Sequence, residues 1–155
     1  MNKYVKVGFT FMWKNYISDI SNDYQFNRPA TITELVSIKK ELNVELPKNL
    51  QELYSETNGV CGEYGIYLIW STDQMVKENL FFRTIHDFRD NMIPLDNFLF
   101  FSDAGNGDLF GYQIKDCRIQ NNEIYVWNHE DDTRSVIASS LEDFISRMIN
   151  GGISI

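Results

Sequence analysis

The chain has 155 residues, with 14 lysines and arginines against 22 aspartates and glutamates, a formal net charge of −8 at pH 7. This length is typical of one domain, expected here to span residues 1–155, with a core large enough to fold without a metal or a disulfide. The negative field argues against nucleic acid and anionic membranes as direct partners. It favours a basic protein as the partner.

Targeting and membrane segments are not expected. The first 13 residues contain lysines but lack the roughly 7 to 15 consecutive apolar residues of a signal peptide. No run approaches the roughly 18 apolar residues that cross a membrane, so we expect a cytoplasmic protein. Cys61 and Cys117 are isolated in the sequence, a pattern that favours reduced, packed thiols and leaves a disulfide between them open.

The first 60 residues predict three helices. Apolar residues recur at helical spacing over residues 13–20. Thr31 and Glu34 form the T-x-x-E pattern of a capping box, and the apolar face that follows leads to Asn43, which suits a left-handed stop. A proline then opens a third helix over residues 47–58.

The rest of the chain predicts four strands and two more helices. One helix begins at Ser71 and runs to about residue 88, with Met75, Leu80, Phe81 and Ile85 as core positions; the other begins at Ser139. The strands are residues 65–70, 98–101, 109–114 and 124–127. Because helices come first, then strands, then a helix, we expect an α+β fold in which four to five helices pack on a largely antiparallel sheet.

The segment SDAGNGDLFGY, residues 102–112, resembles a ligand-binding loop in composition only. It lacks the lysine of a phosphate-binding loop and the spacing of a dinucleotide fingerprint. An EF-hand would place acids where Gly105 and Gly107 stand. The sequence instead predicts a two-residue type I′ turn at Asn106–Gly107, with Asp103 and Asp108 together at its tip.

A catalytic set is not evident. The two histidines, His86 and His129, have no nucleophile or metal ligands at a recognised spacing. We expect no enzymatic activity, no cofactor and no metal. A hydrolase would require His129 to lie beside Asp108 and Asp103 in a deep cleft.

An acidic run at residues 130–132 is either a solvated loop or a docking patch for a basic partner. If it shares one end of the sheet with the acids of the 102–112 segment, the patch becomes larger. Aromatics near strand ends combine contact area with a polar tip, although the core is their alternative location. The candidate partner-binding residues are Asp103, Asp108, Glu130, Asp131, Asp132, Trp70 and Tyr112.

Three segments in this order resemble the SUKH superfamily. Residues 32–60 contain a helix, Leu46-Pro47, a second helix and Asn58-Gly59. FLFFSDAGNGDLFGY is similar to the family's strand, Gly-x-Gly-Asp turn and next strand. IYVWNHEDDTRSVIASSLEDFISRMI is similar to its closing strand, polar loop and final helix. The resemblance covers roughly residues 32–150, and within the family it is to the YobK type of the Smi/Knr-like branch.

The resemblance implies an α+β domain without enzymatic activity. Bacterial members of the family bind and neutralise a cognate toxin, often a nuclease, in the cytoplasm. The corresponding hypothesis is an immunity protein, monomeric or homodimeric, whose acids meet a basic toxin. The alternative, suggested by eukaryotic relatives, is a regulatory interaction domain or scaffold without a toxin partner.

Overall fold

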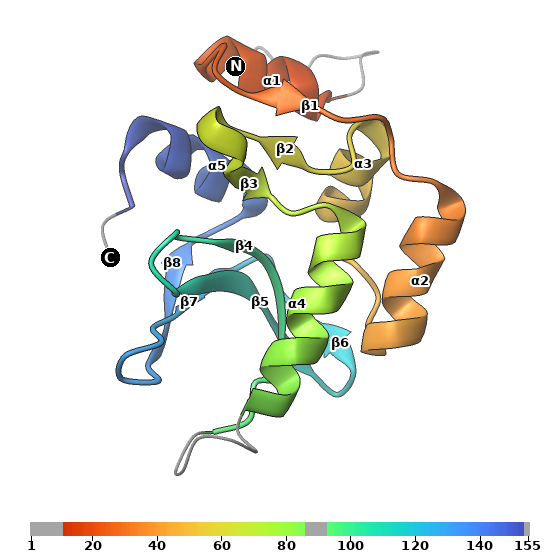
Figure 1. The fold of residues 1–155 in the computed structure, drawn as a ribbon, viewed down its shortest axis with the longest axis vertical. Helices are drawn as coiled ribbons and strands as arrows, with labels where there is room; N and C mark the ends of the chain where they lie inside the picture. Colours follow the sequence, from red (N-terminus) through yellow and green to blue (C-terminus); the bar gives the residue numbers. More distant parts are fainter. Residues whose placement is uncertain (1–10, 86–92, 154–155) are drawn as a thin grey trace.

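The structure is a computed structural model that describes residues 11–85 and 93–153. This part of the chain combines five α-helices with two antiparallel sheets, which confirms the predicted α+β class (Figure 1). The helices are α1 Trp13–Ile20, α2 Ile32–Leu42, α3 Lys48–Glu56, α4 Thr72–Thr84 and α5 Leu141–Asn150, with a short 3-10 helix at Glu63–Gly65.

The smaller sheet has the order β1-β2-β3, and the larger has the order β4-β5-β7-β8 with β6 paired to β5. The strands of the smaller sheet are β1 Gln25–Phe26, β2 Val60–Cys61 and β3 Tyr67–Ile69. Those of the larger sheet are β4 Phe98–Asp103, β5 Leu109–Lys115, β6 Arg118–Ile119, β7 Ile124–Trp127 and β8 Arg134–Ala138. The sequence predicted β3, β4, β5 and β7 but missed the other four strands.

The predicted helix ends are largely confirmed. Thr31 and Glu34 form the complete capping box of α2, and Asn43 ends that helix with φ 55°. Ser71 caps α4 by accepting a hydrogen bond from the amide of Gln74. The cap of α5 is Ser140 rather than Ser139, because the hydroxyl of Ser140 is the one that accepts from a first-turn amide.

The first helix is capped from another part of the chain. Its first-turn amides, of Trp13 and Lys14, donate to the carboxylate of Glu56 in α3 at 2.7 and 3.0 Å. The hydroxyl of Tyr16 donates to the carbonyl of Glu142 in α5 at 3.0 Å. Residues 13–20 are therefore fixed between α3 and α5 although they have no capping residue of their own.

Strand β4, which begins with the continuous apolar run at residues 98–101, is buried on both faces. Leu99 and Phe101 belong to the larger core cluster, and Phe98 and Phe100 belong to a second, aromatic-rich cluster. That second cluster also contains Trp70, Leu95, Leu109 and Trp127. Both faces of the strand are therefore closed to solvent.

The face of helix α4 that packs against the sheet is partly polar. Two of the core positions predicted for this helix are therefore wrong. Leu80 and Phe81 are exposed, whereas Met75 and Asn79 face inward. The Asn79 side chain accepts from the amide of Phe100 and donates to the carbonyls of Phe100 and Met75, each at 2.8 Å. Because the polar residue Asn79 lies on the inner face of α4, the buried face of this helix does not coincide with its apolar face. The hydrophobic pattern therefore predicted the wrong core positions at Leu80 and Phe81.

The tight turn lies elsewhere than predicted. Between β4 and β5 the amide of Ala104 donates to the carbonyl of Asp108 at 3.0 Å, and positive φ falls on Gly105 and Gly107 rather than on Asn106. The two-residue turn with positive φ at both positions joins β5 to β6. Its residues are Asp116 and Cys117, with φ 54° and 60°.

Both cysteines are free thiols in this structure. Cys61 is half-buried in β2, as expected of a packed thiol. Cys117 is exposed in the β5–β6 turn, which corrects the expectation that both thiols are packed.

Glu34 connects the start of α2 to two other segments. Its carboxylate accepts from the amide of Thr31 at 2.9 Å, from both terminal nitrogens of Arg28 at 2.7 and 3.0 Å, and from the side-chain amide of Asn58 at 3.0 Å. These bonds, that from Arg28 above all, lower the pKa of Glu34 to about 2. The ionised carboxylate therefore stabilises the folded state.

We predict that Glu34 accounts for part of the loss of stability in acid. Because its folded pKa lies below its unfolded value, its contribution is complete above about pH 4.3 and is lost as the pH falls towards 2. Glu34→Gln should reduce the difference in urea midpoint between pH 6 and pH 3. Glu41→Gln, an exposed position on the same helix, serves as the control, and an unchanged difference in Glu34→Gln would contradict the assignment.

We also predict that Asn79→Ala lowers the free energy of unfolding by about 3 kcal/mol, because it leaves a buried amide and a buried carbonyl of β4 unpaired. Urea denaturation measures the change. Lys77→Ala, at an exposed position of α4, should stay within about 0.5 kcal/mol of the parent. A small effect of Asn79→Ala would show that the bonds of β4 to α4 are dispensable.

Candidate partner-binding site

The two loops that carry the predicted acids lie side by side at one end of the larger sheet. The amide of His129, in the β7–β8 loop, donates to the carboxylate of Asp108, in the β4–β5 loop, at 3.0 Å. The ring nitrogen Nδ1 of His129 lies 2.6 Å from the same carboxylate oxygen. A Cβ atom at Gly107 would lie only 3.0 Å from the His129 ring, so glycine permits this approach.

Asp108 joins the loops and is not available to a partner, which corrects one predicted site residue. It is 3% exposed. Burial raises the pKa of Asp108, but the hydrogen bonds from His129 and Asn106 outweigh burial and hold the pKa below its ordinary value. The carboxylate is thus ionised and used internally.

The three acids at residues 130–132 divide between structure and surface. Asp132 accepts from the indole of Trp127 at 2.7 Å and from the guanidinium of Arg134 at 3.1 Å. Burial raises the pKa of Asp132, and these bonds together with one from the amide of Ile93 outweigh it. Glu130 and Asp131 are exposed, so two of the three predicted residues face solvent.

The two predicted aromatic anchors are core residues, which corrects that part of the site. Trp70 and Tyr112 are each 1% exposed. The ring of Tyr112 packs 5.3 Å from that of Phe101, and Trp70 belongs to the second core cluster. A position near a strand end does not imply exposure here, because helices and loops cover both faces of the sheet.

Asp103 lines a groove that the sequence did not predict. Its carboxylate accepts from the indole of Trp70 at 2.8 Å and from the amide of Gly105 at 2.9 Å, and it is half-buried. The groove has a volume of about 410 Å³. It is lined by Asp23, Tyr24, Gly62, Glu63, Tyr64, Ile66, Tyr67, Leu68, Asp103, Ala104 and Met148.

The charge in the groove has one sign. Its lining contains three carboxylates, from Asp23, Glu63 and Asp103, and no lysine, arginine or histidine. The pKa of Tyr24 is raised, first by burial and then by the charges of Asp23 and Glu63. The negative charges of both acids therefore reach the Tyr24 hydroxyl. Burial and the charge of Asp103 also raise the pKa of Glu78 in α4.

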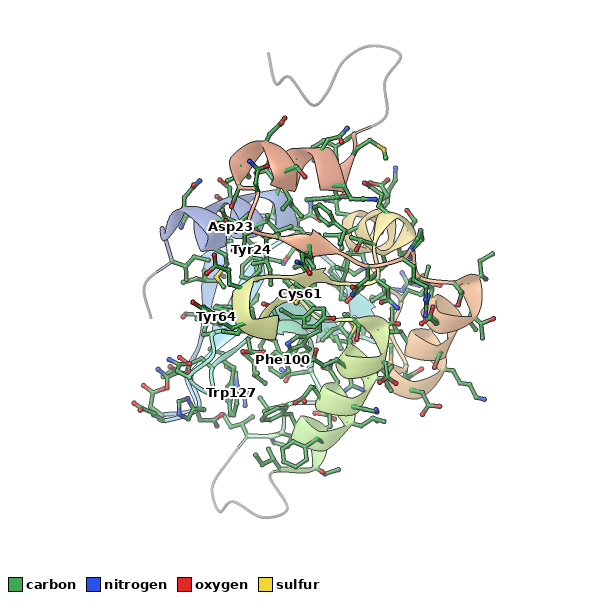
Figure 2. All side chains as sticks on the ribbon, turned by 45° about the horizontal axis from the view of Figure 1, so that its top comes forward. Asp23, Tyr24, Cys61, Tyr64, Phe100 and Trp127 are labelled. Carbon is green, nitrogen blue, oxygen red and sulfur yellow. The ribbon has the colours of Figure 1, made fainter. Side chains whose placement is uncertain are left out.

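Aromatic and apolar side chains accompany these acids. Tyr64 is 93% exposed and has φ 59°, an uncommon conformation for an aromatic residue. Ile66, two residues further on, is also exposed. The ring of Tyr24 lies over Gly62, where a Cβ atom would come within 3.2 Å of it. Figure 2 shows Asp23 and Tyr24 on one side of the short 3-10 helix that carries Tyr64. The β7–β8 loop, which carries Glu130 and Asp131, contacts the β4–β5 loop that follows Asp103. We name the groove together with Glu130 and Asp131 the acidic face.

The one sequence signal for the groove was the Gly62-Glu-Tyr-Gly65 turn, in which two glycines flank an acid and an aromatic residue. The other wall, Asp23 and Tyr24, lies between the first two predicted helices, where the sequence predicts no helix or strand. Its position depends on a long-range contact, the pairing of β1 with β2.

The arrangement that a hydrolase would require is only half present. His129 lies beside Asp108, but neither residue lines the groove that contains Asp103. No group of three or more His, Cys, Asp or Glu in residues 11–85 and 93–153 could hold a metal ion. His86 lies outside the described residues. No helix in the described ranges is long and apolar enough to span a membrane.

We predict that Asp108→Ala lowers the free energy of unfolding by about 2 kcal/mol, because the partly buried amide of His129 loses its acceptor. The matched control is Glu130→Ala in the neighbouring loop, which should change stability by less than about 0.5 kcal/mol. Urea denaturation compares the two variants. Equal effects would mean that Asp108 does not hold the loops together.

Comparison with known proteins gives one family. The SUKH_6 family model, described as SMI1-KNR4 cell-wall, matches residues 32–145. A search of curated proteins finds no match. The matched region includes the 3-10 helix and Asp103 of the groove, while Asp23, Tyr24 and Met148 lie outside it. The match does not test the resemblance to the YobK type, which stays a prediction. Because the family model covers most of the chain, this protein belongs to the SUKH superfamily, in its SMI1-KNR4 family.

Proposed function

We propose that the protein is an immunity protein that binds a cognate basic toxin, specifically a nuclease, through the acidic face and neutralises it by occlusion in the cytoplasm. The SUKH superfamily includes immunity proteins, which supports this class of function. The observation that carries the proposal is the groove, where three carboxylates and an exposed tyrosine occur without a cation in the lining.

Two physical arguments favour a basic partner. A net charge of −8 and an acidic rim steer a cationic protein towards the surface and raise its association rate. Nucleases that bind a phosphate backbone present cationic surfaces, so such a toxin would be complementary to the groove. Tyr64 and Ile66 add the exposed apolar and aromatic area from which interface hot spots are built.

The proposed function requires no catalysis by this protein. Asp108 and Asp132, the most constrained acids of the two loops, are occupied by hydrogen bonds that hold those loops. The same face could serve a regulatory scaffold whose partner is basic but not toxic. Rescue of cell growth from the bound partner separates immunity from scaffolding.

The partner can be isolated by co-purification with this chain and identified by mass spectrometry. We predict that Glu63→Lys/Glu130→Lys slows its association at least about tenfold at low salt and abolishes protection of cells, because both substitutions repel a cationic surface. Stopped-flow kinetics and growth rescue are the two measurements.

The matched control is Glu41→Lys/Asp73→Lys, which changes the net charge equally at exposed positions of α2 and α4, and should retain most of the association rate and the protection. Both double variants should unfold at the parent's temperature within a few degrees. Equal protection by both variants, or binding to a partner that is harmless when expressed alone, would contradict the proposed function.

A further inference from the structure

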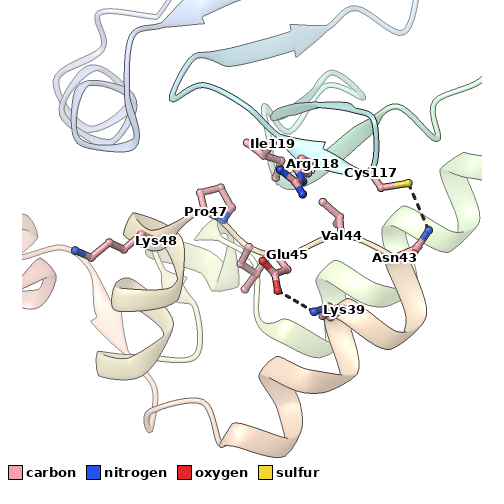
Figure 3. A pocket seen from close by; sticks show the side chains of 10 residues that line it. Lys39, Asn43, Val44, Glu45, Pro47, Lys48, Cys117, Arg118 and Ile119 are labelled. Carbon is pink, nitrogen blue, oxygen red and sulfur yellow. Dashed lines mark hydrogen bonds and ion pairs between the residues drawn. The ribbon is translucent and has the colours of Figure 1, made fainter.

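A second pocket lies between the α2–α3 connection and the β5–β6 turn, and its charge is opposite to that of the acidic face (Figure 3). Its volume of about 610 Å³ lies in the range of small-molecule sites. It is lined by Lys39, Asn43, Val44, Glu45, Leu46, Pro47, Lys48, Cys117, Arg118 and Ile119. We refer to it as the cationic pocket.

Three cations and one acid contribute to the cationic pocket. The ammonium group of Lys39 lies 2.8 Å from the carboxylate of Glu45, which leaves Lys48 and Arg118 as excess positive charge. Lys48 lies at the mouth, with its side chain pointing outward in Figure 3, and its contact with Glu52 is long at 3.9 Å. This excess occurs in a chain whose total charge is −8.

Arg118 differs from most arginines in the described part of the chain. Three of them pair with carboxylates, at Arg28–Glu34, Arg134–Asp132 and Arg147–Asp143. Arg83 donates to two backbone carbonyls. Within the described residues the guanidinium of Arg118 makes no hydrogen bond or ion pair, although the hydrogen bond and charge of Lys39, together with the charge of Arg118, lower the pKa of Glu45.

The register of β5 and β6 places a second positive charge beside Arg118. Lys115 of β5 is directly opposite Arg118 of β6, across the turn of Asp116 and Cys117. Like charges at opposed positions of an antiparallel pair destabilise it. The acids close to this pair are Asp116 in the turn and Glu45 across the pocket. An anion bound to Arg118 would relieve the repulsion.

We propose that the cationic pocket binds a small molecule that carries a phosphate group. A phosphate monoester has a charge of about −1.5 to −2 at pH 7, which matches an excess of two cations better than a single carboxylate does. The planar guanidinium of Arg118 contacts the phosphate oxygens with two N–H groups, and Lys48 turns inward to complete the contact. Val44, Leu46, Pro47 and Ile119 provide apolar surface for the organic part of the ligand. A long polyanion such as RNA is disfavoured because the rest of the protein repels it.

The test is titration of the full chain with phenyl phosphate, with phenol as the uncharged probe, followed by amide NMR. Phenyl phosphate should bind saturably and shift amide signals in residues 39–48 and 115–119, while phenol should shift them weakly. Arg118→Gln should weaken binding about tenfold. Lys77→Gln removes a cation that pairs with Asp73 on α4 and should leave the affinity unchanged.

A third variant is expected to change the affinity in the opposite direction. Glu45→Gln removes the only carboxylate in the lining of the cationic pocket and should tighten binding of phenyl phosphate several-fold, an effect that damage to the fold would not produce. Non-saturable shifts, an equal affinity in Arg118→Gln, or equal losses in Arg118→Gln and Lys77→Gln would overturn the proposal. Saturable binding of a single-stranded RNA oligonucleotide without binding of phenyl phosphate would also overturn it.

Discussion

The connection between the two sheets at β4 is the constraint on which the rest of the structure depends. The amide of Trp70 donates to the carbonyl of Phe101 at 2.9 Å, and the hydroxyl of Ser102 donates to the carbonyl of Leu68 at 2.6 Å. One residue earlier in β4, the main chain of Phe100 is bonded to the side chain of Asn79 in α4. Buried polar bonds of this kind are costly to break, so the strand cannot move independently of its neighbours. Asp103, the last residue of β4, is therefore fixed where β3 and the β4–β5 loop meet, and the groove forms at that point.

The acids of this protein show that residue type does not determine role. Asp108 and Asp132 are held by hydrogen bonds from His129, Trp127 and Arg134, and they act as ionised connectors between chain segments. Glu130 lies within two residues of Asp132 in the same loop and remains in solvent. A buried carboxylate that is fully hydrogen-bonded organises the loops, and the exposed ones are then displayed in fixed positions. The acidic face thus depends on internal acids as much as on external ones.

The sequence predicted the parts of the fold that rest on local rules. The capping box of α2, the stop at Asn43 and the apolar runs of β4 and β7 are each visible in neighbouring residues alone, and all of these elements are present. Strands β1, β2 and β6 have only two residues each, too few to show a period, and they exist because a distant partner pairs with them. Strand β8 has exposed residues at two successive positions, Ser135 and Val136. It therefore lacks the regular alternation of buried and exposed residues by which a strand is recognised.

The candidate site was predicted less well for the same reason. Acid clustering at one end of the sheet could be expected, but whether each acid is buried or exposed follows from cross-loop contacts such as that of Asp108 with His129. The Asp116–Cys117 turn has neither Asn-Gly nor Gly, so the usual signal for two positive φ values was missing. The groove has walls from segments about 40 residues apart, and that separation is what single-sequence patterns do not reveal. Asp23 and Tyr24 form one wall, and the strand that follows them, β1, joins the sheet through two residues only. This wall lies outside the family match, and only Tyr24 of the two residues packs, partly buried, against the core. Under the proposed function, exchanging this segment would change which partner the protein accepts while the matched part of the fold stays intact.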